Sequence, residues 1–172
     1  MNNPIHHLQF AYLPGKSTDA GLHKIVSKIE KTLDNSEFAL GGFVDIEGAF
    51  NNTDYSRYWI IKILESRRVY ASLYDETVWI KPTRGTPQGG CISCLLWILV
   101  INSLLEKLNG LGYYTIGYAD DLVVYTSGRF KNTVIEMMQL AFKEIEKWCK
   151  ENKLSVNPKK NNNCSVLLSK IH

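Results

Sequence analysis

Residues 113–126 read YYTIGYADDLVVYT, and this stretch decides the fold that the sequence predicts. Two runs of β-favouring residues, Tyr113 to Tyr118 and Leu122 to Thr126, are separated by only a few residues, which is the pattern of a β-hairpin. The bend carries two adjacent carboxylates, Asp120 and Asp121, although strands disfavour aspartate. Neighbouring like charges in a partly buried turn need either full solvation or a cation. A solvated turn and a metal site are therefore both open interpretations of this dipeptide.

Another carboxylate lies in the apolar run Phe38 to Ile46, which reads as a buried strand with Asp45 near its C-terminal end. If this strand pairs beside the hairpin, Asp45, Asp120 and Asp121 converge on one point. Such a cluster could bind two Mg²⁺ ions, or Mn²⁺ in their place, about 4 Å apart as two-metal phosphoryl transfer requires. One ion would activate a primer 3′-oxygen, and the other would neutralise a triphosphate and the leaving pyrophosphate.

The rest of the chain alternates between helix and strand signals, without an internal repeat or a linker. The expected helices run from Ser17 or Thr18 to about Leu33, from Thr53 or Asp54 to Leu64, from Ser93 to Leu108 and from Phe130 to Asn152. Further strands are expected at Arg68 to Leu73, Thr77 to Pro82, Leu154 to Asn157 and Cys164 to Leu168, the first two as a hairpin turning at Asp75 and Glu76. This order predicts an α+β domain with helices packed against an antiparallel sheet.

Two of these helices carry apolar residues at three- and four-residue spacing, which is typical of a face packed on a core. The apolar face of the first helix is expected to comprise Leu22, Ile25, Val26 and Ile29. That of the last helix is expected to comprise Val134, Met137, Met138, Ala141, Ile145 and Trp148.

Length and composition describe an ordinary globular protein. The chain has 172 residues, of which 45% are hydrophobic and 22% are charged, so one domain with a sizeable core is expected. The net charge of +3 permits a nucleic-acid partner without demonstrating one. Neither a signal peptide nor a membrane span is expected, and the four cysteines fit free thiols in a reducing compartment. The sequence thus predicts an intracellular protein without membrane contact.

Five segments resemble, in order, the motifs of the reverse transcriptase domain of non-LTR (LINE-type) retrotransposons. Residues 43–50 (FVDIEGAF) resemble motif A, residues 84–90 (RGTPQGG) motif B and residues 118–121 (YADD) motif C. Gln9 to Thr18 is similar to the fingers motif, and residues 154–160 (LSVNPKK) resemble motif D. The resemblance implies a polymerase palm-type antiparallel sheet with packed helices plus a partial fingers segment, and no thumb.

The resemblance also implies boundaries and residue roles. One reverse transcriptase domain would span residues 1–172, with a fingers remnant at about 1–36 and the palm at about 37–172. Asp45, Asp120 and Asp121 would be the catalytic metal ligands, and Lys160 would assist the leaving pyrophosphate. The implied nucleotide-binding residues are Phe50, Gln88, Gly89 and Lys16, and the implied nucleic-acid-binding residues are Arg67, Arg68 and Arg84. Phe50 would exclude a 2′-hydroxyl by its volume, although simple packing is the alternative for it.

The expected function is an RNA-directed DNA polymerase that adds dNTPs to a DNA primer on an RNA template. The leading alternative is a truncated, catalytically weak or inactive retroelement relic that at most binds nucleic acid. Leu13 and Asn51 favour the relic, because they stand where the family usually has arginine and aspartate. The short segment between motifs A and B favours it too. A viral RNA-dependent RNA polymerase is a third alternative, weaker because YADD and Phe50 suit DNA synthesis.

Overall fold

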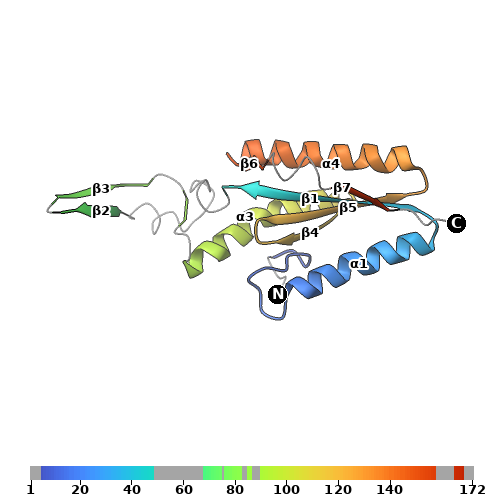
Figure 1. Ribbon diagram of the computed structural model, residues 1–172, viewed down its shortest axis with the longest axis horizontal. Coiled ribbons are helices and arrows are strands. Elements are labelled where there is room, and N and C mark those ends of the chain that lie inside the picture. Colours follow the sequence, from blue (N-terminus) through green and yellow to red (C-terminus); the bar gives the residue numbers. More distant parts are fainter. Residues whose placement is uncertain are drawn as a thin grey trace.

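The computed structural model describes residues 5–48, 68–74, 76–82, 85–86, 90–157 and 165–168. The described helices are α1 (Thr18–Asp34), α3 (Cys91–Gly110) and α4 (Lys131–Glu151). The described strands are β1 (Phe38–Glu47), β2 (Val69–Leu73), β3 (Glu76–Ile80), β4 (Tyr114–Tyr118), β5 (Asp121–Gly128), β6 (Ser155–Val156) and β7 (Ser165–Leu168) (Figure 1). The expected α+β class is confirmed. The helix expected between Thr53 and Leu64 lies outside the described residues.

Strand β1 is the centre of a five-stranded antiparallel sheet with the order β4-β5-β1-β6, in which β7 also pairs with β1. The pairing of β1 with β5 runs from Phe38 opposite Gly128 to Asp45 opposite Asp121. On its other edge, β1 pairs with β7 near its beginning and with β6 at its end. Because β1 has neighbours on both edges, its backbone N–H and C=O groups can be paired within the sheet.

Helices cover both faces of this sheet (Figure 1). Because side chains alternate along a strand, Leu40 and Val44 of β1 point into the core shared with α3 and α4, whereas Ala39 points into the smaller core beneath α1. Helix α4 approaches β1 closely at Gly42, where an added Cβ would lie 2.6 Å from Cζ of Phe142. A glycine at this position therefore allows the helix to pack closely on the strand.

Helix α3 supplies more fully buried side chains to the larger core than any other described element, among them Ile101, Leu104 and Leu108. Residues Ile92–Gly110 of this helix are long and apolar enough to cross a membrane by length and composition alone, which corrects the sequence-based expectation of no such run. Since 56% of the apolar window is buried inside the protein, packing within the core accounts for its hydrophobicity.

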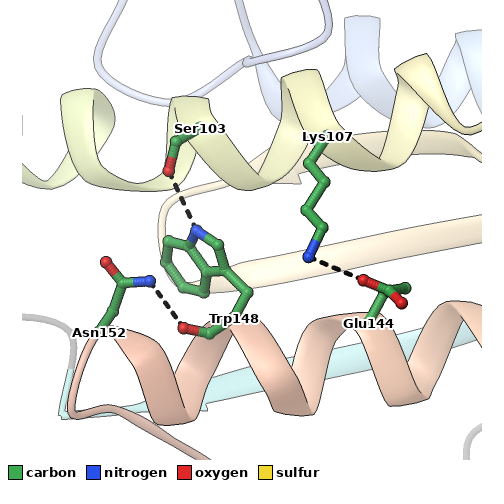
Figure 2. A network of polar contacts seen from close by, with 5 residues as sticks. All are labelled: Ser103, Lys107, Glu144, Trp148 and Asn152. Atoms are coloured by element: carbon green, nitrogen blue, oxygen red, sulfur yellow. Dashed lines mark hydrogen bonds and ion pairs between the residues drawn. The ribbon is translucent and has the colours of Figure 1, made fainter.

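Helices α3 and α4 contact each other through polar as well as apolar side chains (Figure 2). The indole Nε1–H of Trp148 donates to Oγ of Ser103 at 3.0 Å. Lys107 and Glu144 form an ion pair at 2.7 Å, and Lys107 lowers the pKa of the Glu144 carboxyl. Both of these charged side chains are about one third exposed (33% and 34%), so the pair adds little stability. The expected apolar face of α4 is confirmed, with Met137 only half-buried.

The predicted apolar face of α1 is only partly correct. Ser17 caps the helix as expected, since its side chain accepts a hydrogen bond from the amide of Ala20. Ile25 is buried and Ile29 packs against the smaller core, but Leu22 and Val26 are exposed. Leu22 instead lines the cavity described below. The side of α1 that packs on the smaller core therefore carries Ile25 and Ile29 but not Leu22 and Val26.

The segment before α1 protects the outer edge of β4. The amide of Phe10 donates to the carbonyl of Gly117 at 2.9 Å, and the amide of Gly117 donates to the carbonyl of Leu8 at 3.0 Å. Gln9 between them is fully buried. These bonds satisfy an edge that would otherwise be open to strand addition.

Strands β2 and β3 form a hairpin that extends away from the sheet and its helices (Figure 1). Every residue of both strands is exposed. The hairpin was expected, but Glu76, which was predicted to lie in the turn, pairs with Leu73 and belongs to β3. The chain turns one residue earlier than predicted, with Tyr74 at a positive φ of 53°.

Candidate functional site

Asp45 and Asp121 lie directly opposite each other where β1 and β5 meet. Residues opposed in an antiparallel pair point to the same face, with Cβ atoms typically about 4.5–5.5 Å apart. Asp120 precedes this pair in the turn, and its carbonyl accepts a hydrogen bond from the amide of Ile46 at 3.1 Å. The prediction that Asp45 lies beside the acidic turn is therefore confirmed.

The turn between β4 and β5 is hydrogen-bonded to a side chain of the larger core. Tyr118 pairs with Asp121, which leaves Ala119 and Asp120 as the two turn residues. Ala119 has a φ of +54°, a conformation that costs a residue with a Cβ about 1–2 kcal/mol. The indole Nε1–H of Trp97, a fully buried residue of α3, donates to the carbonyl of Ala119 at 2.7 Å. This hydrogen bond connects the strained turn to helix α3 in the larger core, and no local sequence signal indicates it.

Asp45 and Asp121 help to line a largely apolar cavity of about 320 Å³. The cavity is lined by Thr18 and Leu22 of α1, by Phe43, Val44 and Asp45 of β1, and by Tyr118, Asp121, Leu122 and Val123 of the β4–β5 hairpin. The aromatic side chains of Phe43 and Tyr118 are both exposed. The cavity therefore offers flat apolar surfaces next to two carboxylates.

Asn157 orients one of these carboxylates. Its Nδ2 donates to Oδ2 of Asp45 at 2.9 Å, and its backbone amide donates to the carbonyl of Asp45 at 3.0 Å. A ligand carboxylate that is itself hydrogen-bonded is fixed in direction, as is usual around metal sites. Sequence reasoning missed this residue, because its position beside Asp45 depends on the pairing of β6 with the end of β1.

Asp120 lies near the side chains of Tyr12 and Cys94. The pKa of the Tyr12 phenol is raised first by burial and then by the neighbouring Cys94 and Asp120. Asp120 is not among the residues that line the cavity. Across the described part of the chain, no group of three or more His, Cys, Asp or Glu side chains could hold a metal ion. The convergence of all three aspartates therefore stays a prediction.

Asp45 and Asp121 by themselves fit a hard divalent cation. Mg²⁺ prefers oxygen ligands and is commonly held by one or two carboxylates together with substrate phosphates. Two carboxylates on one face, one of them oriented by Asn157, supply such a ligand set.

Lys16 and Arg68, two of the predicted site residues, each lie close to an aromatic ring. The Lys16 ammonium lies 4.4 Å from the centre of the Phe10 ring and donates to the carbonyl of His7, and burial lowers its pKa. Arg68 lies at the base of the β2–β3 hairpin, with its guanidinium 5.1 Å from the centre of the Trp79 ring. The other predicted site residues, Phe50, Arg67, Arg84, Gln88, Gly89 and Lys160, lie outside the described residues.

Residues 1–168 match the model of a protein family described as reverse transcriptase (RNA-dependent DNA polymerase). The Retrovirus-related Pol polyprotein from type-1 retrotransposable element R1 of Bradysia coprophila is 25% identical over 164 residues, which cover 87% of this chain and 16% of that protein. The RNA-directed DNA polymerase from mobile element jockey of Drosophila melanogaster is 23% identical over 176 residues, covering 91% of this chain and 19% of that protein. The chain thus spans less than a fifth of the length of these two curated relatives.

Proposed function

This chain belongs to the reverse transcriptase (RNA-dependent DNA polymerase) family, and on that premise we propose that it acts as the RNA-directed DNA polymerase domain of a non-LTR retrotransposon protein. One observation carries the proposal: Asp45 and Asp121 oppose each other beside an apolar cavity, at the positions where the family's motifs A and C bring their carboxylates together. In this interpretation the sheet with α3 and α4 forms the palm, and residues 1–36 form a fingers remnant.

Asp45 and Asp121 would hold Mg²⁺, with Asp120 as a third ligand. When bound, Mg²⁺ supplies positive charge that activates a primer 3′-hydroxyl and neutralises the triphosphate. The side chains of the chain then have the tasks of binding and orientation. Asn157 fixes the direction of Asp45, and Trp97 holds the turn that carries Asp120 and Asp121.

The apolar walls of the cavity would receive the sugar and base next to the reacting phosphate. Phe43 and Tyr118 present exposed aromatic surfaces there, and closing such a site by substrate removes water from the carboxylates. We assign the RNA template, the DNA primer and dNTPs as substrates. Phe50 as the sugar gate, Gln88 and Gly89 as nucleotide contacts and Lys160 beside the leaving pyrophosphate belong to the same proposal.

A primer-extension assay tests this function. The chain is mixed with an RNA template, a labelled DNA primer, dNTPs and Mg²⁺, and primer length is followed over time. We expect template-directed extension that stops when the metal is chelated. A folded chain that binds the template–primer but never extends the primer would contradict the proposal and support the inactive relic.

The hydrogen bond from Trp97 to Ala119 gives a more specific prediction. Trp97→Phe removes the indole N–H that donates to the carbonyl of Ala119. Because that carbonyl then lacks this hydrogen bond, we expect a loss of about 1–3 kcal/mol in the free energy of unfolding. Extension should fall further than this loss of stability explains, because the turn is no longer held in place.

The matched control is Trp148→Phe, which removes the indole donor to Ser103 at the contact between α3 and α4 (Figure 2). We expect a comparable change in unfolding free energy with extension close to wild type at temperatures where both variants are folded. Equal losses of extension in the two variants would show that the Ala119 hydrogen bond has no positioning role.

A further inference from the structure

The β2–β3 hairpin has two chemically different faces, although all of its strand residues are exposed. Cross-strand partners share a face, and faces alternate along each strand. Tyr70 opposite Trp79 and Ser72 opposite Thr77 therefore form one face, which we call the aromatic face. The pairs Val69 with Ile80, Ala71 with Val78 and Leu73 with Glu76 form the other, which we call the aliphatic face.

The aromatic face combines flat rings, hydroxyl groups and one cation. Tyr70 and Trp79 are 59% and 55% exposed, so their ring faces are open to a ligand. The guanidinium of Arg68 lies over the Trp79 ring, which extends the flat surface and adds a positive charge. Ser72 Oγ and Thr77 Oγ1 lie 3.0 Å apart, which confirms that these two side chains share the face.

Charge separates the two faces further. Among the described residues of the two strands, the one carboxylate, Glu76, is opposite Leu73 and so belongs to the aliphatic face. The aromatic face therefore combines a cation with stacking surfaces and has no described carboxylate beside it. A polyanion with exposed planar groups is complementary to such a surface.

We propose that the aromatic face binds unpaired nucleotides of single-stranded RNA, with bases stacked on Tyr70 and Trp79 and a phosphate beside Arg68. Naming the template RNA as the source of these nucleotides rests on the proposed function. Aromatic stacking tolerates any base, which suits a template of varied sequence. The aliphatic face offers neither stacking rings nor a cation and carries Glu76, so it is not expected to bind RNA.

Binding of a fluorescein-labelled oligouridine to the full chain, followed by fluorescence anisotropy without Mg²⁺ or dNTPs, tests this assignment. We expect Trp79→Ala to weaken binding by about tenfold or more, the range that loss of one stacked base produces. Tyr70→Ala should weaken it in the same direction, and Trp79→Phe should retain most of the affinity. Arg68→Gln should reduce the slope of log affinity against log salt by about 0.7, the value for one phosphate contact on a single strand.

The neighbouring cross-strand pair supplies the matched control. Ile80 is 60% exposed, close to the value for Trp79, but faces the opposite way. Ile80→Ala and Val69→Ala should leave RNA affinity within about twofold of wild type. Circular dichroism of each variant confirms that the fold is retained.

Several results would overturn the assignment. These are an absence of RNA binding by the wild-type chain, wild-type affinity in Trp79→Ala, or an equal loss in the aliphatic-face variants. Self-association that only the Tyr70 and Trp79 variants abolish would also overturn it, because the aromatic face would then be an interface between copies. The binding assay does not require catalysis, so the two proposals can fail separately. If the aromatic-face variants lose RNA affinity in a chain that never extends a primer, the polymerase proposal is contradicted and the RNA-binding proposal is retained.

Discussion

Asp121→Asn is expected to lower the rate of template-directed nucleotide addition by about 10³-fold or more. A carboxylate that holds a catalytic metal stabilises transition-state charge by several kcal/mol, and a thousandfold change corresponds to about 4 kcal/mol. Asparagine keeps the size of the side chain while removing its charge. Asp45→Asn should have an effect of similar size, because Asp45 lies directly opposite. Single-turnover primer extension measures both.

Glu146→Gln is the control, since it neutralises an exposed carboxylate on α4. We expect its extension rate to match wild type. Millimolar Mg²⁺ should raise the melting temperature of wild type but not of Asp121→Asn, because only the folded acidic site binds the ion. An unchanged extension rate in Asp121→Asn would refute the assignment of the catalytic pair. Asp120→Asn provides the test of the third ligand: an equal loss of extension supports convergence of all three aspartates.

The largest expected effect on stability comes from the centre of α3. Leu104→Ala removes a fully buried side chain from the larger core, so we expect a loss of about 2–5 kcal/mol in the free energy of unfolding. For a chain of this size the loss corresponds to a melting temperature lower by roughly 10 °C. Urea unfolding followed by circular dichroism measures the difference.

Leu140→Ala makes the same chemical change on α4, where the side chain is 52% exposed, against 0% for Leu104. We expect it to change stability by no more than about 0.5 kcal/mol. Comparable losses in the two variants would mean that α3 is not the centre of the core.

The central elements were predictable because their signals are local. Alternating β-favouring residues around the acidic turn indicated the β4–β5 hairpin, and the apolar run ending near Asp45 indicated β1. Their boundaries agree with the structure to within a few residues. The proximity of Asp45 to the turn was predictable only on the condition that these strands pair. The structure supplies that pairing.

The contacts that complete the site could not be predicted, because they depend on where whole elements pack. The apolar spacing of α1 is the same for Ile25 and for Leu22, yet Ile25 is buried in the smaller core, while Leu22 is exposed and borders the cavity. The hydrogen bonds of Trp97 and Asn157 join segments that are far apart in the sequence. The strand-edge contact of residues 8–10 likewise has no local signal, because it requires the position of β4.

The pairing of β1 with β5 also has a consequence for how the protein folds. These strands are separated in the chain by the β2–β3 hairpin, helix α3 and strand β4, so their contact closes a long loop and is expected to form late and slowly. During synthesis β1 emerges from the ribosome well before β5. Until β5 is available, the apolar side chains and unpaired backbone groups of β1 are exposed, which favours aggregation. The two opposed aspartates meet only when that loop is closed, so a chain in which β1 and β5 have not yet paired lacks the acidic pair.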